Sequence, residues 1–568
     1  MIGVMAHDSD HGVVREFFEL FKTPWEVYRC GRQYDVLLCA ADQDVEEAAA
    51  KLTLIYAGRK LRCDSDASIQ SGAGSRILSH HGTAIPLYGD AITFCKEKGA
   101  TRDAELQQPI ISVLPSCGGV RLRIGYDLFS EARTLLLQGQ PPANADKPAL
   151  ELHIALLRDL IIGHGIRLIE IPPVPDGHSF IACLTHDVDH PSIRQHRWDH
   201  TVFGFLYRAV FGSLRNLMLG RMPVRDLLKN WVAALKLPFV YAGWASDFWR
   251  DFDVRYLELE NGLHSTFFVI PFKNSPGTNF QGPPATFRAA RYRAADLVDT
   301  IRKLMSAGCE VGLHGIDAWC DSARGRAELE EIRRLTGESK VGVRMHWLYC
   351  DQQTPATLEK ADASYDSTIG YNETVGYRAG TTQVYKSLEV TRLLELPLHV
   401  MDTAMFYPAY LGLSPSQAKM VLGRMADNVV KFGGCLTVNW HDRSLAPERL
   451  WYASYRDLVQ DLKSRGAWFA TAGEAVAWFY KRRSVVFETD GTGPDGVRAK
   501  VTGGHDVGLP GLRLRIHKGR ELREISGQES EGCLDLAFDE SVDTRVPVEP
   551  ADEYSRTGEF KSGERVAK

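Results

Sequence analysis

Seven short apolar runs recur between Ser179 and Phe479, and amphipathic helical stretches separate most of them. This alternation constrains the fold more than any other feature of the chain. The runs are FIACLT, STFFVI, CEVGLH, VGVRMH, LLELPL, CLTVNW and GAWFAT. Such runs are typical of strands buried on both faces, and strands that alternate with helices favour a parallel sheet. We therefore predict an α/β fold with a (β/α) barrel, closed or distorted; an open doubly wound sheet is the alternative.

The chain is 568 residues long, which predicts several domains. Strand-like and helical patterns alternate over residues 1–178 and predict an N-terminal α/β domain. Within it, helical patterns cover residues 42–52, 121–137 and 148–165. The barrel is expected over 179–483, and a small glycine-rich β appendage over 484–519. The polar stretch 520–568, with its mixed charges, is predicted to be a disordered tail.

An insert at about residues 200–245 interrupts the barrel pattern and is amphipathic, aromatic and basic. The favoured interpretation is a pair of helices packed on the barrel. A lid over the site and a helix at a membrane surface are the alternatives. No run of eighteen or more apolar residues occurs, so no membrane span is predicted and peripheral contact is the only membrane contact considered.

The composition limits the classes of ligand and the cellular compartments that are expected. The formal net charge is −5, so no basic excess points to nucleic acid. Eleven cysteines include no CxxC pair, and several, such as Cys39, Cys183 and Cys435, lie in apolar runs. This usage is typical of buried thiols in a reduced compartment and disfavours a thiolate zinc site. The N-terminus lacks the pattern of a secretion signal, so a cytoplasmic location is expected.

Two carboxylates end the first barrel run, in the stretch THDVD. Asp187 and Asp189 are two residues apart, so on a strand both face the same side. Two close carboxylates repel each other unless a cation or a proton lies between them. His186 and His190 should face the other way and are expected to be structural. A solvated turn after a buried strand is the alternative interpretation of this stretch.

Three further runs end in polar residues that could share the same pocket. His314 ends EVGLH, and Asp317 follows three residues later, where it could bind a divalent ion or cap a helix. Arg344 and His346 are two apart and therefore share a face, and the arginine could hold a carboxylate ionised. His441 follows the buried run CLTVNW. Parallel strands bring their carboxyl ends to one edge, so these groups should cluster.

In this order, the motifs THDVD, GLHG, GVRMH, YDSTIGYNETVGYRAGT, ELPLHVMDT and NWH resemble the polysaccharide deacetylases. These NodB-homology enzymes, of the carbohydrate esterase 4 type, have a distorted (β/α) barrel. The resemblance covers residues Ser179 to Phe479 and is greatest to bacterial polysaccharide-cluster members with an extra N-terminal domain.

The resemblance implies a role for each matched residue. Asp187 matches the general base, Asp189 and His314 match metal ligands, Arg344 matches the arginine that orients the base, and His441 matches the general acid. The implied cofactor is a divalent metal ion, with zinc expected.

Two positions need a choice. Asp402 is preferred to Asp442 as the partner that orients His441, because strand neighbours point to opposite faces. The second histidine of the family's HxxxH pair falls on Ala318, which cannot ligate a metal. Asp317 or His346 could replace it, or the metal could be lost.

The implied function is metal-dependent hydrolysis of an N- or O-acetyl group, or a related acyl group, on a sugar. The expected substrate is a sugar or polysaccharide precursor in surface polysaccharide or glycoconjugate biosynthesis. Trp347, Tyr349 and Trp440 could stack on sugar rings or pack in the core. A non-catalytic sugar-binding or assembly protein on a decayed deacetylase barrel is the alternative, and Ala318 is its main support.

Overall fold

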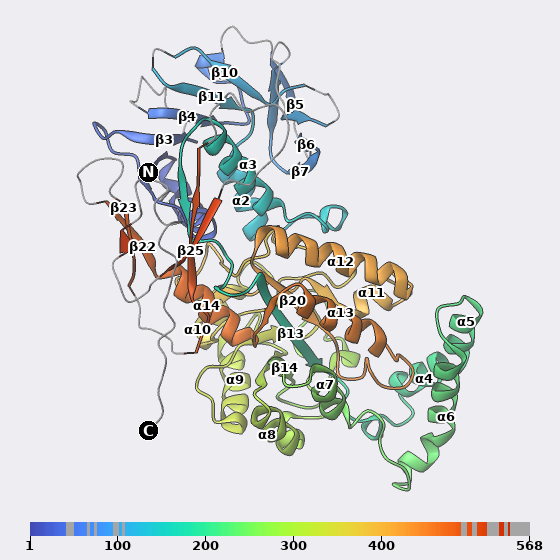
Figure 1. Ribbon diagram of the computed structural model, residues 1–568. Coiled ribbons are helices and arrows are strands. Elements are labelled where there is room, and N and C mark those ends of the chain that lie inside the picture. The colour runs from blue at the N-terminus through green and yellow to red at the C-terminus, as the bar shows by residue number, and fades with distance from the viewer. Residues whose placement is uncertain are drawn as a thin grey trace, which may run out of the picture.

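The computed structural model describes most of the chain, which forms an N-terminal domain packed beside a larger α/β body (Figure 1). The described residues are 1–40, 50–64, 69–72, 76–94, 101–104, 108–116, 118–489, 497–502, 508–519, 533–538 and 544–545. Among the described helices, none is both long enough and apolar enough to cross a membrane.

The N-terminal domain is built on a six-stranded sheet in the order β10-β11-β4-β3-β1-β2. Its strands are β1 (Ile2–Met5), β2 (Trp25–Val27), β3 (Tyr34–Cys39), β4 (Ala50–Tyr56), β10 (Ile111–Leu114) and β11 (Val120–Ile124). All neighbours pair in parallel except β10 and β11. Three helices, α1 (His11–Phe21), α2 (Leu128–Leu137) and α3 (Ala149–Gly163), share one apolar core with the sheet. Smaller strands lie beside it: β5 (Ile69–Gly72), β6 (Arg76–His80), β7 (Thr83–Leu87), β8 (Ala91–Phe94) and β9 (Arg102–Asp103).

Two helices predicted in this domain need correction. The helix expected over 121–137 begins only at Leu128, because Val120–Ile124 pairs in parallel with β4 and Asp127 caps α2 by accepting from two backbone amides. The VRLRI sequence has the period of two of a strand, which the longer helical pattern concealed. Most of the helix expected over 42–52 lies outside the described residues, and its last three positions begin β4.

The larger body confirms the predicted (β/α) architecture. Parallel strands run in the order β16-β15-β14-β13-β20-β19, and β21 pairs with the start of β13. They are β13 (Phe180–Val188), β14 (Ser265–Val269), β15 (Glu310–Gly315), β16 (Val343–Met345), β19 (Val400–Met401), β20 (Cys435–Asn439) and β21 (Ala467–Phe469). All residues of β13 and β14 are buried, as expected of strands covered on both faces.

Two short segments close this sheet into a distorted barrel. The Ser367 amide donates to Val343 O of β16, and the Leu396 amide donates to Asp366 O. The same extended chain then continues from β18 (Leu394–Glu395) into β19, where the His399 amide donates to Thr437 O of β20. Backbone hydrogen bonds therefore connect β16, through residues 366–367 and 394–399, to β20 on the other side of the sheet. Because the sheet is closed in this way, the open doubly wound alternative is wrong.

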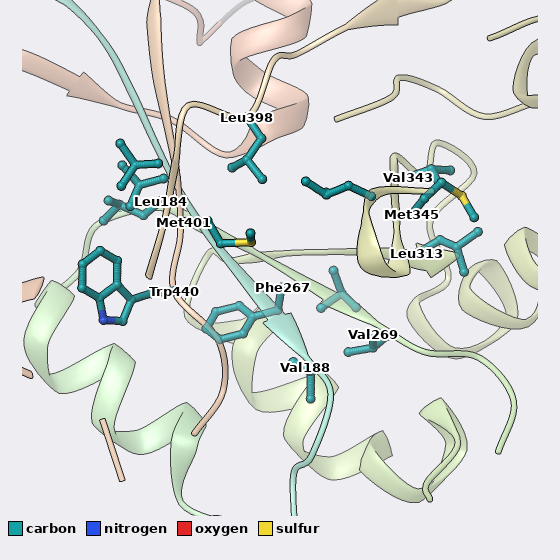
Figure 2. Packing of buried hydrophobic residues seen from close by; sticks show 14 of the residues in the cluster. Leu184, Val188, Phe267, Val269, Leu313, Val343, Met345, Leu398, Met401 and Trp440 are labelled. Carbon is teal, nitrogen blue, oxygen red and sulfur yellow. The ribbon is translucent and has the colours of Figure 1, made fainter. Parts of the chain in front are cut away.

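The side chains of the barrel strands divide between two faces. Leu184, Val188, Phe267 and Val269 belong to the apolar cluster in Figure 2, which packs against the surrounding helices. The intervening positions face the barrel interior, since Arg344 of β16 reaches Thr185 and Asp187 of β13 across it. The helices are α7 (Phe252–Glu260), α8 (Val298–Ser306), α9 (Ser322–Thr336), α10 (Thr354–Ala361), α11 (Asp402–Phe406), α12 (Pro415–Phe432), α13 (Tyr452–Ser464) and α14 (Ala472–Arg483).

The N-terminal domain packs against segment 376–382, which lies in the chain between the two parts of the closing wall. The amides of Leu150 and Gln140 donate to Gly380 O and Arg378 O, at 2.8 and 2.7 Å. The buried carboxylate of Glu151 accepts from the Thr381 hydroxyl at 2.6 Å. A buried carboxylate and backbone bonds therefore hold segment 376–382 on the N-terminal domain.

The insert forms α4 (His200–Tyr207), a π-helical turn at 208–212, α5 (Ser213–Met218) and the antiparallel α6 (Val224–Tyr241). At the other end of the chain, β22 (Val485–Thr489), β23 (Val497–Val501) and β26 (Thr544–Arg545) form one small sheet.

The strands β24 (Leu512–His517) and β25 (Cys533–Phe538) join β12 (Leu168–Glu170) in another small sheet. The disordered tail predicted from residue 520 therefore contains strands at 533–538 and 544–545, because the apolar residues of CLDLAF pair with β24. The rest of that prediction lies outside the described residues.

Candidate metal centre and active site

Asp189 lies at the centre of a cluster of histidines beyond the end of β13. Its Oδ1 is 3.3 Å from His314 Nε2 and 3.6 Å from His346 Nε2. His314 ends β15, and His346 directly follows β16. The three side chains place one ligand atom each within 4.8 Å of the others. Parallel strands thus bring residues more than 150 positions apart in sequence to one edge of the barrel.

The hydrogen bonds around the cluster fit a bound cation. His314 Nδ1 lies 3.0 Å from Arg344 O, and because a carbonyl only accepts, this nitrogen carries the proton. In the neutral imidazole with this tautomer, Nε2 is an acceptor, and it faces Asp189 Oδ1, which is buried and has no hydrogen-bond partner among the described residues. A cation between these two atoms is compatible with this arrangement. Tetrahedral ligands around zinc are about 3.3 Å apart, which agrees with the distances found.

The protonation states also suit metal ligands. Burial alone would raise the pKa of Asp189, but His346, His314 and His441 together hold it well below its ordinary value. Burial lowers the pKa of His346 well below its ordinary value, which favours the neutral imidazole. A carboxylate and neutral imidazoles are the forms that bind divalent metals. Two nitrogens and one oxygen suit zinc or a similar ion.

Asp317 is not brought into the cluster. Its Oδ1 accepts from the Thr278 amide at 2.6 Å, and its Oδ2 accepts from Arg324 Nη1 at 3.1 Å. Of the two replacements considered for the missing ligand, His346 lies in the cluster and Asp317 does not. The alternative role of Asp317 as a helix cap is wrong, because Asp321 caps α9, whereas Asp317 contacts Thr278 of a neighbouring loop and Arg324 of α9.

A side chain at position 318 does not reach the metal cluster, because Ala318 packs against α9. It is fully buried, and a Cβ placed on Gly325 would lie 3.1 Å from both Cα and Cβ of Ala318. This close approach of two backbones requires a small residue at each position. The HxxxH spacing therefore has no room for a second imidazole here.

Asp187 lies beside the cluster and is held from two sides. Arg344 Nη1 donates to Oδ1 at 3.2 Å, and Asn439 Nδ2 donates to Oδ2 at 2.7 Å. Arg344 is itself fixed, because Nε and Nη2 donate to the carbonyl and hydroxyl of Ser367 at 3.0 and 2.8 Å. Donors on both oxygens fix the orientation of the carboxylate. Asp187 Oδ2 lies 3.8 Å from His314 Nε2, so it borders the metal site.

Asn439 had no predicted role. It lies two residues before His441, so the strand period could have placed its side chain inside the barrel with the other polar residues.

His441 faces the cluster from the end of β20, the strand next to β13. Its Nε2 is 3.8 Å from Asp189 Oδ2, and its Nδ1 is 2.6 Å from Asp402 Oδ1. Burial alone would lower the pKa of His441, but Asp402, with Asp189 and Asp187 beyond it, raises this pKa to about 10. Asp402 is fully buried and also accepts from Ser444 Oγ and from the His441 amide. This pair keeps a protonated imidazole at the site near neutral pH.

Neighbours of the site residues have structural roles. Asp442 Oδ2 accepts from the His190 amide at 2.8 Å, away from His441 Nδ1. His186 stacks against Tyr256 of α7, and its ring nitrogens contact Glu260 and the Trp440 carbonyl at 2.8 Å each.

Aromatic side chains surround one side of the metal cluster. Trp347 follows His346 directly, and its ring centroid is 5.1 Å from that of Phe287, which is 61% exposed. The ring centroid of Tyr349 is 4.5 Å from that of Phe280. Trp440 is different, since it is fully buried between Phe406 and Tyr455 and belongs to the core.

No family model matches the chain, and no curated protein matches it. Among solved structures, the chain is similar to a probable polysaccharide deacetylase from Pseudomonas aeruginosa PAO1, at 15% identity and a TM-score of 0.35, over 55% of this chain and 94% of that one. It is also similar to the polysaccharide deacetylase Bc1974 from Bacillus cereus, at 11% identity and a TM-score of 0.24, over 51% and 91%. A third similar structure is Puue allantoinase, at 13% identity and a TM-score of 0.33, over 55% and 93%. Likeness this remote leaves the activity of the chain to be argued from its own residues.

Proposed function

We propose that this protein is a metal-dependent hydrolase that removes an acyl group, such as acetyl, from a sugar. The observation that carries the proposal is the arrangement around Asp189. A candidate three-ligand metal site lies between the carboxylate of Asp187, held by two donors, and the imidazole of His441, held protonated by Asp402. A base and an acid that both border a Lewis acid suit hydrolysis of an amide or ester.

Asp189, His314 and His346 would hold the ion. When bound there, a zinc-like ion supplies Lewis-acid polarisation of an acyl carbonyl and lowers the pKa of water. Asp187 accepts the proton of the attacking water, and Arg344 and Asn439 keep its carboxylate oriented for this transfer. His441 donates a proton from Nε2 to the departing amine or alcohol, while Asp402 holds Nδ1.

The substrate class follows from the surroundings. The ring centroid of Trp347 lies 5.7 Å from that of His346, and the ring centroid of Tyr349 lies 6.0 Å from that of Trp347. Exposed Phe280 and Phe287 extend this aromatic surface. Flat apolar rings with polar groups close by suit a sugar. We propose an N- or O-acylated sugar, as part of a polysaccharide or glycoconjugate precursor. A formyl or other small acyl group would be handled by the same residues.

The non-catalytic alternative depended on the missing ligand at Ala318. With His346 as the third ligand, Ala318 no longer argues for a non-catalytic protein, because base, acid and ligands then all face one site.

The test is hydrolysis of an acetylated amino sugar and of an acetylated sugar ester by zinc-loaded protein. Wild type should release acetate. Asp187→Asn should lower kcat by about 100-fold or more while keeping its zinc, because a general base contributes about 10²–10⁴-fold. Full zinc occupancy with no hydrolysis of a broad panel of acylated sugars would favour the binding protein. Full activity of Asp187→Asn would show that the base is assigned wrongly.

A further inference from the structure

The helical hairpin formed by α4, α5 and α6 has apolar faces that nothing in the described chain covers. On α4, the π-helical turn and α5 the exposed apolar residues are Phe203, Tyr207, Phe211, Leu214 and Met218. On α6 they are Val224, Leu228, Trp231, Val232, Leu235 and Phe239. An apolar patch of this extent that is exposed to water marks a binding site.

These residues follow the helical repeat. Spacings of three and four place each set on one side of its helix. The opposite side of each helix is buried: Phe205 and Ala209 pack with Ala233 and Leu237 in one small core. The hairpin therefore already has an interior, and its second apolar surface needs a partner outside it. Individual exposure is large, with Met218 at 77% and Leu235 at 74%.

The charge of the hairpin indicates which partner. Residues 200–245 contain six cations and one carboxylate, in a chain whose net charge is −5. The cations are Arg208, Arg215, Arg221, Arg225, Lys229 and Lys236. A groove of about 960 Å³ beside α6 is lined by Arg225, Lys229 and Lys236, together with Arg255 and Arg456 from the barrel side and the carboxylates Asp226 and Glu258. Cations next to exposed aromatic and aliphatic residues are the pattern of a helix that lies in the interface of an anionic membrane.

We propose that this hairpin docks on the surface of an anionic lipid bilayer, with its apolar stripes in the interface and its cations among the lipid phosphates. A second copy of the chain fits less well, because a symmetric contact would bring two equally cationic hairpins together. Trp198 and Trp244, 84% and 81% exposed at the base of the hairpin, are residues of the kind enriched at the interface level.

The hairpin is anchored on the loops that carry the candidate site. It is inserted after β13, only a few residues beyond Asp189, and Ser192 Oγ donates to Asp247 at 2.6 Å across its base. Arg208 forms an ion pair with Glu448 in the loop that follows His441. Figure 1 shows α5 and α6 projecting beyond the barrel. Docking would therefore hold the edge of the barrel that carries the site close to the lipid surface.

The test is co-sedimentation of the full-length protein with vesicles of phosphatidylcholine alone, or of phosphatidylcholine with phosphatidylglycerol. We expect binding to the anionic vesicles only, weakened by salt. Leu235→Ser with Phe239→Ser should abolish it, while Met420→Ser with Val430→Ser, two exposed positions on α12, should not. Arg215→Glu with Lys236→Glu should weaken binding at least roughly fivefold for each cation, whereas Lys419→Glu with Arg424→Glu on α12 should have little effect.

Vesicle binding needs neither metal nor turnover, so its result is independent of the proposed function. Circular dichroism of each variant checks that the fold is kept. No sedimentation with anionic vesicles, or equal sedimentation of wild type and the α6 serine variant, would overturn the proposal. A dimer in sedimentation velocity that the serine variant dissociates, without vesicle binding, would assign the surface to a second copy instead.

Discussion

The side-chain amide of Asn439 in β20 binds both the carboxylate and the backbone amide of Asp187 in β13. Asn439 Nδ2 donates to Asp187 Oδ2 at 2.7 Å, and Asn439 Oδ1 accepts from the Asp187 amide at 3.1 Å. The two strands are parallel neighbours, so this contact fixes the carboxylate relative to the wall that carries His441. The amide of Asn439 can satisfy both groups at once because it carries a donor and an acceptor.

Asn439→Ala should therefore lower kcat by about 10- to 100-fold, since a hydrogen bond to a charged group is worth about 1.5–3 kcal/mol. Metal content should stay at the wild-type level, because Asn439 does not contact the ligand atoms. Metal analysis and steady-state kinetics check both statements. A variant that lost its metal would show that Asn439 supports the metal cluster rather than the base.

His346→Ala should lower zinc affinity by more than about 100-fold, because it removes one of three protein ligands. Asp317→Asn is the matched control, since it keeps the volume and the contact with the Thr278 amide. Zinc titration with a competing chelator measures both. Normal zinc affinity in His346→Ala together with loss in Asp317→Asn would reverse the ligand assignment.

Ala318→His would restore the HxxxH spacing but should not strengthen zinc binding. Position 318 packs against Gly325, so an imidazole has no space there. The free energy of unfolding of this variant should therefore be about 1–3 kcal/mol lower than that of wild type. Ala323→His, at an exposed position of α9, is the control. Denaturant unfolding and zinc titration decide the matter. A tighter zinc site in Ala318→His would mean that the loop can turn position 318 toward the cluster.

Asp402→Asn should move the alkaline limb of the pH–rate profile to lower pH. A general acid works below its pKa, and Asp402 is the main group that raises the pKa of His441 to about 10. Without this carboxylate the pKa should fall toward the ordinary value of about 6.5. The kcat profile between neutral and alkaline pH measures the shift. An unchanged limb would show that His441 is not the acid seen in the profile.

The same pair links folding stability to pH. The pKa of His441 is raised in the folded state, so its contribution is full below about pH 6.5 and is lost as pH rises through about 10. The pKa of Asp402 is lowered, because its contact with His441 outweighs burial, so its contribution is present above its unfolded pKa and is lost as pH falls through the lowered value. Denaturant unfolding of wild type and His441→Ala across this range tests the linkage.

The sequence allowed the site to be predicted where residues lie on regular strands. A period of two put Asp187 and Asp189 on one face and favoured Asp402 over Asp442, and the structure brings the selected residues together. The same period could have indicated Asn439, but only the partner strand reveals that its amide meets Asp187. The choice between Asp317 and His346 could not be made, because both lie in irregular backbone after their strands. Trp347, with φ of 66°, belongs to that irregular stretch.

The fold could be predicted from its apolar runs, among them LLELPL at 393–398, which forms part of the wall that closes the barrel. The other part of that wall, residues 365–369, could not be predicted, because it pairs through single bridges and isolated hydrogen bonds that leave no apolar period in the sequence. Local patterns describe regular strands well, but an irregular wall is determined by its partners in space.

That closing wall has a consequence for the N-terminal domain. Ser367 accepts hydrogen bonds from Arg344, and Arg344 donates to the proposed base Asp187. The closing wall therefore positions the proposed base through Arg344. The chain of the wall then runs on to segment 376–382, whose backbone bonds to the N-terminal domain. A domain without any of the reacting groups thus serves as the scaffold for their alignment. The two domains should therefore unfold as one cooperative unit, although the sequence pattern divides them near residue 178.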